Sequence, residues 1–272
     1  LEGIVSLRKL ILNDKDIVIK DIMKTNIISI QTHVDQEEIA SLFKKYDLIA
    51  MPVVDNENRL VGIITIDDIV DIIDQENTED FQKMAAMEPS DEEYLKTNVF
   101  ILAKHRVIWL MALMISATFT GNIIKKFEDV LQSVVILTVF IPMLMDTGGN
   151  AGSQSATLII RGLALEEIKP KDILKVLWKE LQVGTIVGLI LTAVNFIRIY
   201  CFEKTDIKIA ITVSTSLFFT VVLAKVVGGV LPMLAKKLKL DPAIMASPLI
   251  TTIVDAAALI AYFTMASWLL GL

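Results

Sequence analysis

The sequence predicts an α-helical membrane protein with five transmembrane helices, preceded by a small α/β domain and a connecting helix. Three observations lead to this fold class. The chain has 272 residues, of which 54% are hydrophobic, and the apolar residues are concentrated after residue 103. The apolar runs there reach the roughly 17–25 residues that a transmembrane helix needs. Ahead of them, short strand-like and helix-like patterns alternate among charged residues, which is typical of a small soluble α/β domain.

The soluble part is predicted from three strand-like runs that alternate with helical patterns. These runs lie at residues 27–30, 50–54 and 60–64. A helix follows the first run, because Asp35 and Glu38 have capping-box spacing just before apolar residues at helical intervals. Thr65 is placed to cap a second helix, which begins near Ile66.

A strongly acidic segment connects the soluble part to the apolar part. It runs from Asp67 to Glu93, has Lys83 as its single base, and interleaves apolar residues with the acids. Two interpretations stay open: a solvated helix face, or a cation-sensing element. Neighbouring carboxylates repel each other by about 1 kcal/mol per close pair even in high dielectric, and divalent cations relieve that repulsion. In the second interpretation the regulatory acids are Asp68, Asp71, Glu76, Glu79 and Asp80.

Five apolar segments that are long enough to span a membrane follow, at residues 107–124, 130–160, 181–197, 209–231 and 242–270. Three of them contain one charged residue each, namely Asp146, Lys225 and Asp255. The fifth segment starts with Asp241 and Pro242. An acid at the cap followed by a proline at the first helical position is a favourable helix start.

The distribution of basic residues predicts the orientation of these segments. The loops after the second and fourth segments carry more Lys and Arg than the loops after the first and third. Basic loops stay preferentially on the cytoplasmic side of a membrane. We therefore expect a multi-pass protein in the lipid bilayer of the plasma membrane, with its N-terminal part in the cytoplasm.

The second apolar segment carries a polar stripe. At 3.6 residues per turn, one face of a helix there collects four polar residues, Asp146, Asn150, Ser153 and Thr157. A polar face on a membrane helix points into a bundle or a water-filled path rather than toward lipid. Glycines at 148, 149 and 152 allow another backbone to approach closely. We interpret this segment as one wall of an ion pathway.

The fifth segment carries a second polar stripe, formed by Ser247, Thr251 and Asp255 at steps of four. Counted from the inner ends of the two helices, Asn150 lies roughly 17 Å and Asp255 roughly 21 Å into the membrane. The two stripes are therefore predicted to meet near mid-membrane, with Asn150 at a similar depth to Asp255. Because an isolated carboxylate is costly there, a cation or a partner group is expected at Asp255.

Alternatives stay open for three further charged residues of the membrane part. Asp146 either attracts cations at the outer mouth of the path or packs between helices. Glu128 either gathers cations at the same mouth or only caps the helix that follows it. Lys225 either pairs with an acid inside the bundle or extends toward an interface.

Composition excludes several classes of function. Cys201 is the single cysteine, which excludes an internal disulfide and a thiolate metal cage. Two histidines, His33 and His105, are too few for a multi-histidine transition-metal site, whereas the abundant oxygen ligands suit hard cations such as Mg²⁺. The net charge of −6 disfavours nucleic-acid binding. The spans contain no nucleophile–base pair, so an enzyme is not expected.

The motif MPVVDNENRLVGIITIDDIVDII, at residues 51–73, resembles a CBS domain. The resemblance covers a complete second repeat and the end of a first one. CBS domains usually pair and often bind adenosine nucleotides, and the family pattern places Thr65 and Asp68 at the ribose. It therefore implies a nucleotide such as ATP at these residues, with a CBS scaffold that binds no nucleotide as the alternative.

Two further motifs lie in the membrane part, DTGGNAGSQSATLIIRGLA at 146–164 and DPAIMASPLITTIVDA at 241–256. Together with the CBS repeat, the acidic segment and the five spans, they resemble the MgtE family of magnesium channels and transporters. That family is homodimeric, and its second and fifth helices line a central pore. The resemblance implies that Asp255 is the key pore acid. It further implies that hydrated Mg²⁺ is contacted by Gly149, Ser153, Thr157 and Thr251. To these pore residues we add Asn150 and Ser247, which lie on the two polar stripes.

By this resemblance the chain divides into four parts, the end of a first CBS repeat (1–12), a second CBS repeat (13–74), an acidic plug helix (75–103) and a five-helix pore domain (104–272). The predicted function is a Mg²⁺-selective channel or transporter that passes largely hydrated ions through a dimeric pore. Cytosolic Mg²⁺, sensed at the acidic region, is expected to gate it through the plug helix. A sensing membrane protein without conduction, and a transporter of Mn²⁺ or Co²⁺, remain alternatives. Because the chain opens at Leu1 in mid-domain, we expect a truncated N-terminus.

Overall fold

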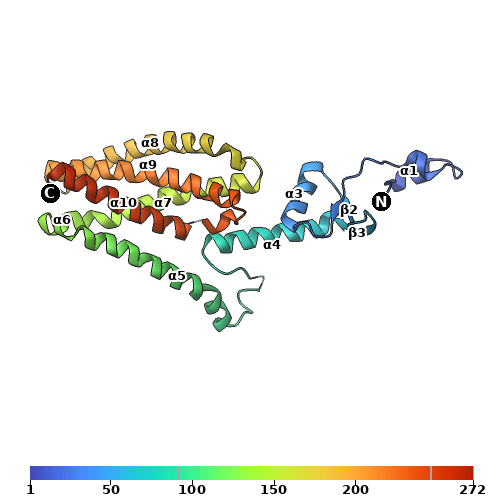
Figure 1. Cartoon of the computed structure of the whole chain (residues 1–272), viewed down its shortest axis with the longest axis horizontal. Helices are drawn as coiled ribbons and strands as arrows, with labels where there is room; N and C mark the ends of the chain where they lie inside the picture. The colour runs from blue at the N-terminus through green and yellow to red at the C-terminus, as the bar shows by residue number, and fades with distance from the viewer. Residues whose placement is uncertain (91, 246, 272) are drawn as a thin grey trace. The chain divides into compact units, whose positions relative to one another are not determined.

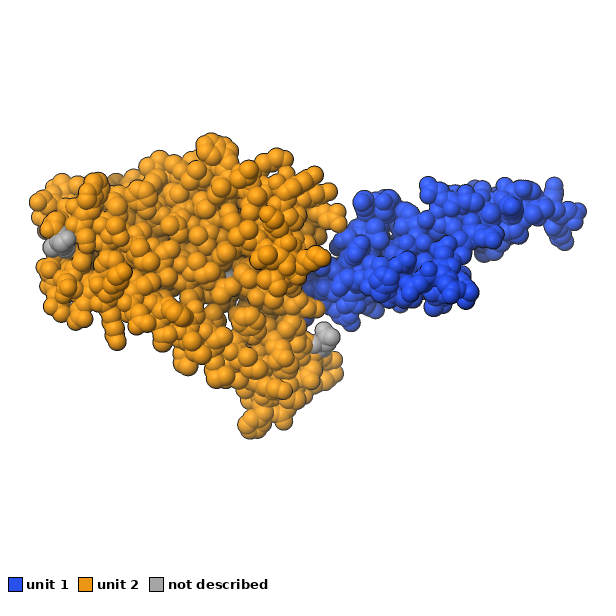
Figure 2. All heavy atoms as spheres, in the orientation of Figure 1, with its two compact units in different colours: residues 1–78 blue, residues 79–272 orange. Residues whose placement is uncertain are grey.

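The computed structural model describes residues 1–90, 92–245 and 247–271, with the side chain of Ser247 outside the description. The chain divides into two compact units, Leu1–Thr78 and Glu79–Leu272, which Figure 2 shows in different colours. The boundary falls inside one helix, α4 (Ile66–Met84). Each unit has its own buried apolar core, so we describe them separately.

Unit 1 is a small α/β domain (Figure 1), and its elements are α1 (Leu7–Leu12), α2 (Ile19–Ile22), β1 (Ile30–Gln31), α3 (Gln36–Tyr46), β2 (Ala50–Val54), β3 (Leu60–Thr65) and the first part of α4. The sheet has the order β1-β2-β3, with β1 parallel and β3 antiparallel to β2. Phe43, Met51 and Ile69 come from α3, β2 and α4 and are almost fully buried in its core.

The predicted elements of unit 1 are largely confirmed. The carboxylate of Asp35 caps α3 by accepting the backbone N–H of Glu37 at 2.9 Å. The second and third strands and the start of α4 lie where the sequence predicts them. The predicted first strand at 27–30 is wrong in its extent, because β1 pairs with β2 only through Ile30 and Gln31.

The predicted helix at 75–103 is wrong in its bounds. Its first part continues α4 without a break, and α4 ends at Met84, where Ala86 adopts a positive φ of 52°. Pro89 follows, which lacks the backbone N–H that a helix requires. The Gln82 side chain binds the backbone of Ser90 through both its oxygen (2.6 Å) and its nitrogen (2.9 Å), which stabilises this turn. A new helix then begins at Val99, capped by Asn98.

Unit 2 contains five long helices, α5 (Val99–Lys126), α7 (Leu137–Ala164), α8 (Ile173–Ile197), α9 (Ile207–Lys237) and α10 (Ser247–Leu270). Short helical segments join them, namely α6 (Glu128–Ser133), η1 (Pro170–Asp172), η2 (Arg198–Phe202) and η3 (Pro242–Met245). Helices α7, α8, α9 and α10 form a bundle, and α5 packs against α10 (Figure 1). The predicted fold class, a helical membrane protein with a small α/β domain ahead of it, is confirmed.

Four of the five long helices are long and apolar enough to cross a membrane, α5, α8, α9 and α10. Helix α7 matches α5 in length, at 28 residues, but its polar stripe and glycines interrupt the apolar run, so it is not among these four. The predicted start of the second span at residue 130 is wrong. Residues 128–133 form the separate helix α6, and Val134 leaves helical geometry at φ −139°, so that α7 begins at Leu137. A run of β-branched residues at 134–136 favours this break.

Glycines bring α7 into close contact with its neighbours. A methyl group added at Gly152 would stand 2.8 Å from Cγ2 of Ile250 on α10 and 3.3 Å from the carbonyl oxygen of Ala224 on α9. One added at Gly228 of α9 would overlap the backbone of Gly152. Small residues at such crossings let helix backbones approach, as the sequence predicts. Helix α7 therefore packs closely against both α9 and α10, and its polar stripe is left on the opposite side.

Candidate functional site

A groove of about 720 Å³ runs along the polar stripe of α7, lined by Asn150, Ser153, Gln154, Thr157, Leu158 and Lys225. Three of the predicted pore residues, Asn150, Ser153 and Thr157, therefore share one surface. They do so because α7 is an uninterrupted α-helix from Leu137 to Ala164, so steps of three and four residues stay on one face. Three of the four predicted stripe residues thus share this surface, and their role in a pore stays a prediction.

This stripe is accessible in the single chain. Asp146, Asn150 and Thr157 are exposed, and Ser153 and Asp255 are partly buried. The opposite face of α7 is buried against α9 and α10 through Gly148, Gly149 and Gly152 among others. An exposed row of carboxylate, amide and hydroxyl groups on a membrane helix is costly against lipid. The row therefore requires water, an ion or another protein surface opposite it.

Gly149 and Thr251 are brought into contact by the packing of α7 on α10. A methyl group added at Gly149 would stand 2.9 Å from Cγ2 of Thr251. The hydroxyl of Thr251 donates to the carbonyl oxygen of Pro248 at 2.9 Å, within its own helix. Thr251 is partly buried and Gly149 is buried. Ser247, the other predicted residue of this stripe, begins α10, and its side chain lies outside the described residues.

The register between α7 and α10 refines the predicted depth of Asp255. Helices α7 and α10 run antiparallel, with Gly149 against Thr251 and Gly148 against Val254. Asp255 lies one turn beyond Thr251, which places it level with Asp146 rather than with Asn150. Asp146 is also the charged residue whose repulsion acts on Asp255. The depths predicted from the sequence were counted from the ends of the two helices. The register between α7 and α10 was not known at that point.

Two charged residues inside the bundle lie behind the stripe. Lys225 of α9 is buried and donates from Nζ to Oε1 of Gln154 at 2.9 Å. Glu180 of α8 is buried and accepts the hydroxyl of Ser155 at 2.6 Å. Lys225 is buried in the bundle, as predicted, but its hydrogen-bond partner is the amide of Gln154 and not the acid that the sequence led us to expect. Sequence analysis missed Gln154 and Ser155, although the two charges within apolar helices were a signal that polar partners must lie nearby.

Glu128 occupies the first turn of the short helix α6. It is exposed, and its Oε1 accepts the side-chain amide of Gln132 at 3.1 Å. An acid in the first turn interacts favourably with the helix dipole. Among the described residues of α6, Glu128 makes no capping hydrogen bond to the backbone, so its effect on the helix is limited to this interaction with the dipole, and its role at the outer mouth stays a prediction.

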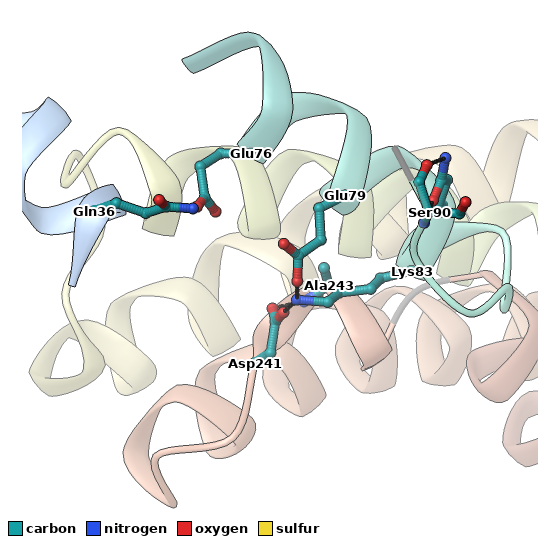
Figure 3. Close-up of polar contacts among 8 residues, drawn as sticks. Gln36, Glu76, Glu79, Lys83, Ser90, Asp241 and Ala243 are labelled. Atoms are coloured by element: carbon teal, nitrogen blue, oxygen red, sulfur yellow. Dashed lines mark hydrogen bonds and ion pairs between the residues drawn. The ribbon is translucent and has the colours of Figure 1, made fainter. Parts of the chain in front are cut away.

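The acids from Asp67 to Asp80 lie along α4, and several of them make polar contacts. Glu76 accepts the side-chain amide of Gln36 at 2.8 Å (Figure 3). Further along α4, Lys83 binds Glu79 and also Asp241, the latter at 2.6 Å, as Figure 3 shows. Burial lowers the pKa of Lys83, but its hydrogen bonds to Asp241 and Glu79 outweigh burial and raise that pKa above its usual range. Lys83 is therefore charged at neutral pH.

Thr65 and Asp68 come together at the start of α4. The hydroxyl of Thr65 donates to Oδ2 of Asp68 at 2.7 Å, and the Thr65 backbone N–H donates to the same oxygen at 3.2 Å. Both residues are at the surface of unit 1. The same carboxylate and hydroxyl groups are the ones that the CBS pattern assigns to a ribose.

Within the described residues of one chain, no group of three or more His, Cys, Asp or Glu side chains has the arrangement of a metal site. The predicted pore residues offer mainly amide, hydroxyl and carbonyl oxygens, with one carboxylate from Asp255 and one from Asp146. Such neutral oxygen groups can bind a hydrated ion through its water molecules, which suits Mg²⁺ because it gives up its water reluctantly.

Comparison with known families matches both units. The pattern of the MgtE family, described as a divalent cation transporter, matches residues 141–265. The pattern of the CBS domain matches residues 19–75. The first match covers all of the pore positions predicted on α7 and α10.

Curated relatives carry the same combination of parts. The chain is 39% identical over 270 residues to "Magnesium transporter MgtE" of Thermus thermophilus, a match that covers 99% of this chain and 60% of that protein. It is 37% identical over 267 residues to the protein of the same name from Bacillus subtilis, covering 98% of this chain and 58% of that protein. The chain thus spans about three fifths of the length of these relatives. Their names describe transporters and not enzymes, in agreement with the sequence-based expectation.

A solved structure described as the cytosolic domain of the Mg²⁺ channel MgtE in complex with ATP is 46% identical where it aligns. The alignment covers 26% of this chain and 29% of that one, with a TM-score of 0.26. The two sequence motifs of α7 and α10, the CBS pattern and the identity over nearly the whole chain agree with one another. Residues 141–265 match the membrane domain of the MgtE family of divalent cation transporters, and residues 19–75, ahead of it, match a CBS domain.

Proposed function

We propose that this chain forms a Mg²⁺-selective channel or transporter in which two copies enclose a pore between their α7 and α10 helices. The observation that carries the proposal is the exposed polar stripe of α7, with Asp255 partly buried beside it. A second copy related by a two-fold axis would place the same stripe opposite the first. The polar groups would then face a common wet path instead of lipid.

The chemistry of the stripe supports a largely hydrated Mg²⁺ as the transported ion. Amide, hydroxyl and carbonyl oxygens can accept hydrogen bonds from the ion's water molecules, so that the ion need not dehydrate. Two copies of Asp255 supply two negative charges to one divalent cation. One intramembrane acid per chain is therefore sufficient for charge balance.

Transport is tested by reconstituting the chain in liposomes that contain a Mg²⁺-sensitive dye. A transporter makes the dye respond to external Mg²⁺, whereas a membrane protein that senses divalent cations without conducting them does not. Adding Mn²⁺ or Co²⁺ in the same assay ranks the ions and tests the alternative that another divalent cation is carried. Dye signals no faster than in protein-free liposomes would contradict the proposal.

The dimeric pore predicts that Asn150 of one copy lies near Asn150 of the other. We expect a short thiol-reactive cross-linker to join two chains that carry Asn150→Cys, in a Cys201→Ser background because Cys201 is exposed. The product is measured as a dimer band on a denaturing gel.

The control for this experiment is Lys171→Cys in the same background. Lys171 lies in the short connecting segment η1, outside the polar stripe, and is exposed, so a cysteine there reacts with thiol reagents but is not expected to join two chains. Equal cross-linking at both positions, or none at Asn150→Cys, would contradict the proposed interface.

We further propose that cytosolic Mg²⁺ gates the pore through the acids along α4, Asp68, Asp71, Glu76, Glu79 and Asp80. Support comes from Lys83, which links Glu79 of α4 to Asp241, immediately ahead of the segment that leads into α10. A divalent cation that binds the α4 acids would change the charge balance around Lys83. The proposal places unit 1 and α4 in the cytoplasm, and the long helices in the plasma membrane.

The gating proposal predicts a loss of Mg²⁺-dependent protection from proteases when the acids are neutralised together. In the unmodified chain we expect Mg²⁺ to slow cleavage around residues 85–98. In the variant Asp68→Asn, Asp71→Asn, Glu79→Gln, Asp80→Asn we expect Mg²⁺ to have no effect, because the repulsion that it relieves is gone. Adding ATP to the same digest tests whether a nucleotide binds at Thr65 and Asp68.

The matched control neutralises four acids elsewhere, Glu2, Asp14, Asp16 and Glu166, all of which are exposed and lie outside the acidic segment. It changes the net charge by the same amount and should retain the response to Mg²⁺. An unmodified chain whose digestion is the same with and without Mg²⁺ would refute the sensing role.

A further inference from the structure

Two buried charges of opposite sign reach α7 from two different helices. Glu180 of α8 is 8% exposed and Lys225 of α9 is 6% exposed. Neither is among the residues that line the predicted pore by family resemblance. Charged groups inside a membrane bundle normally serve a function or pair with one another, because an isolated one is costly.

Both side chains end on consecutive residues of α7. The hydroxyl of Ser155 donates to Oε2 of Glu180 at 2.6 Å, and Nζ of Lys225 donates to Oε1 of Gln154 at 2.9 Å. Ser155 is buried, whereas Gln154 is exposed and lines the groove together with Lys225. The two contacts therefore fasten α7 at neighbouring positions that point in different directions around its axis.

The helices that carry the charges are shaped to receive each other's side chain. A methyl group added at Gly229 of α9 would stand 2.7 Å from Cγ of Glu180. One added at Gly184 of α8 would stand 3.3 Å from Cβ of Lys225. The aliphatic part of Glu180 thus passes over Gly229 of α9, and that of Lys225 passes over Gly184 of α8, before the charged groups reach α7. This reciprocal packing leaves little freedom for either head group.

Electrostatics ties the two contacts together. Glu180 is the acid whose attraction acts on the Lys225 ammonium group. Removing one partner of a buried pair leaves an uncompensated charge, whereas removing both restores neutrality. The effects of changing Glu180 and Lys225 should therefore not be additive.

We infer that Glu180 and Lys225 are positioning residues that clamp α7 through Ser155 and Gln154 and fix its rotation about its own axis. Asn150, Ser153 and Thr157 lie on the same rigid helix, so the clamp determines where the polar stripe points. The clamp gives the stripe a fixed orientation toward the groove. That this orientation matters for ion passage rests on the proposed function, whereas the rotation itself can be measured without transport.

The test measures rotation of α7 as the reactivity of Thr157→Cys toward a water-soluble thiol reagent, in a Cys201→Ser background. Thr157 is exposed on the stripe, so the cysteine should react readily. Adding Lys225→Met or Glu180→Gln should lower the rate at which the cysteine reacts by about ten-fold. Each change leaves the other buried charge without its partner, and α7 is expected to rotate away from that charge. The same variants should lower Mg²⁺ flux, with a larger effect on the half-saturating concentration than on the maximal rate.

Two further variants distinguish positioning from general loss of folding. Lys225→Arg keeps the charge and the donors, and should retain the reactivity of Thr157→Cys. The double variant Glu180→Gln with Lys225→Met removes both charges, and should react faster than either single variant. Unchanged reactivity in both single variants of the folded protein would overturn the inference. Altered reactivity in a chain that moves no Mg²⁺ at all would support the clamp and count against the proposed transport.

Discussion

Replacing Asp255 with alanine is expected to lower Mg²⁺ flux by at least about 100-fold, because each chain loses its central pore charge. In the proposed dimer the change removes two negative charges from the site that holds one divalent cation. A carboxylate about 4 Å from a unit charge contributes on the order of 4 kcal/mol at an effective dielectric of 20, so little binding should survive. Asp255→Asn, which has nearly the same shape, should have a similar effect.

The protein should remain folded in both Asp255 variants. Asp255 is partly buried and lies at the level of another acid, Asp146, so removing it takes away like-charge repulsion rather than a salt bridge. Elution as a single dimeric species in detergent, together with dye-monitored flux in liposomes, separates loss of transport from loss of structure. Asp255→Ala with normal flux would refute the assignment of Asp255 as the pore acid.

The control is Asp146→Asn, which removes the other carboxylate at the same level of the membrane. Asp146 is exposed on the outer half of the stripe and is expected to be well hydrated. Its neutralisation should lower flux only a few-fold, in proportion to the weaker screened attraction of an exposed charge. Equal losses for both variants would mean that the two acids act as one site.

Replacing Gly228 with alanine is expected to destabilise the membrane domain more than any other single methyl group. The added methyl would overlap the carbonyl oxygen of Gly152 and stand 2.9 Å from the carbonyl carbon. Both sides of this contact are backbone, so no side chain can move aside. Overpacking costs about 1–3 kcal/mol in an ordinary core, and a contact between two backbones should lie at or above the upper end.

The matched control is Gly121→Ala on α5, where an added methyl group meets nothing within 4 Å. Alanine is the better helix former by about 1 kcal/mol, so this variant should be neutral or slightly stabilising. Thermal unfolding in detergent compares the two. We expect Gly228→Ala to lower Tm by about 5–10 °C, since 1 kcal/mol shifts Tm by about 2–4 °C in a domain of this size. An unchanged Tm would contradict the close crossing of α7 and α9.

Local sequence rules predicted the individual elements well where they depend on local physics. The strand at Ala50–Val54, the helix that follows Asp35 and the stripe of α7 all follow from periodicity and capping. The predicted ends of helices were wrong where competing local conformations are close in free energy. The apolar run from residue 130 contains a break at Val134, because apolar composition alone does not separate one helix from two.

The connecting region illustrates the same limit. An acidic, partly apolar segment at 75–103 has helical character, but Pro89 and the positive φ of Ala86 divide it. The Gln82 contacts to Ser90, which stabilise the turn, could not be inferred from spacing. The link from Lys83 to Asp241 joins residues 158 positions apart and was equally invisible in the sequence.

The sequence by itself determined the class of this protein, the number of long helices and the polar stripes on α7 and α10. Hydropathy and helical period act along the chain, so they can be read without a fold. Only the tertiary structure decided that Asp255 lies level with Asp146, that Gly152 meets Gly228, and that Glu180 and Lys225 fasten α7. These features depend on the register between helices, which side-chain packing sets and which no local pattern encodes.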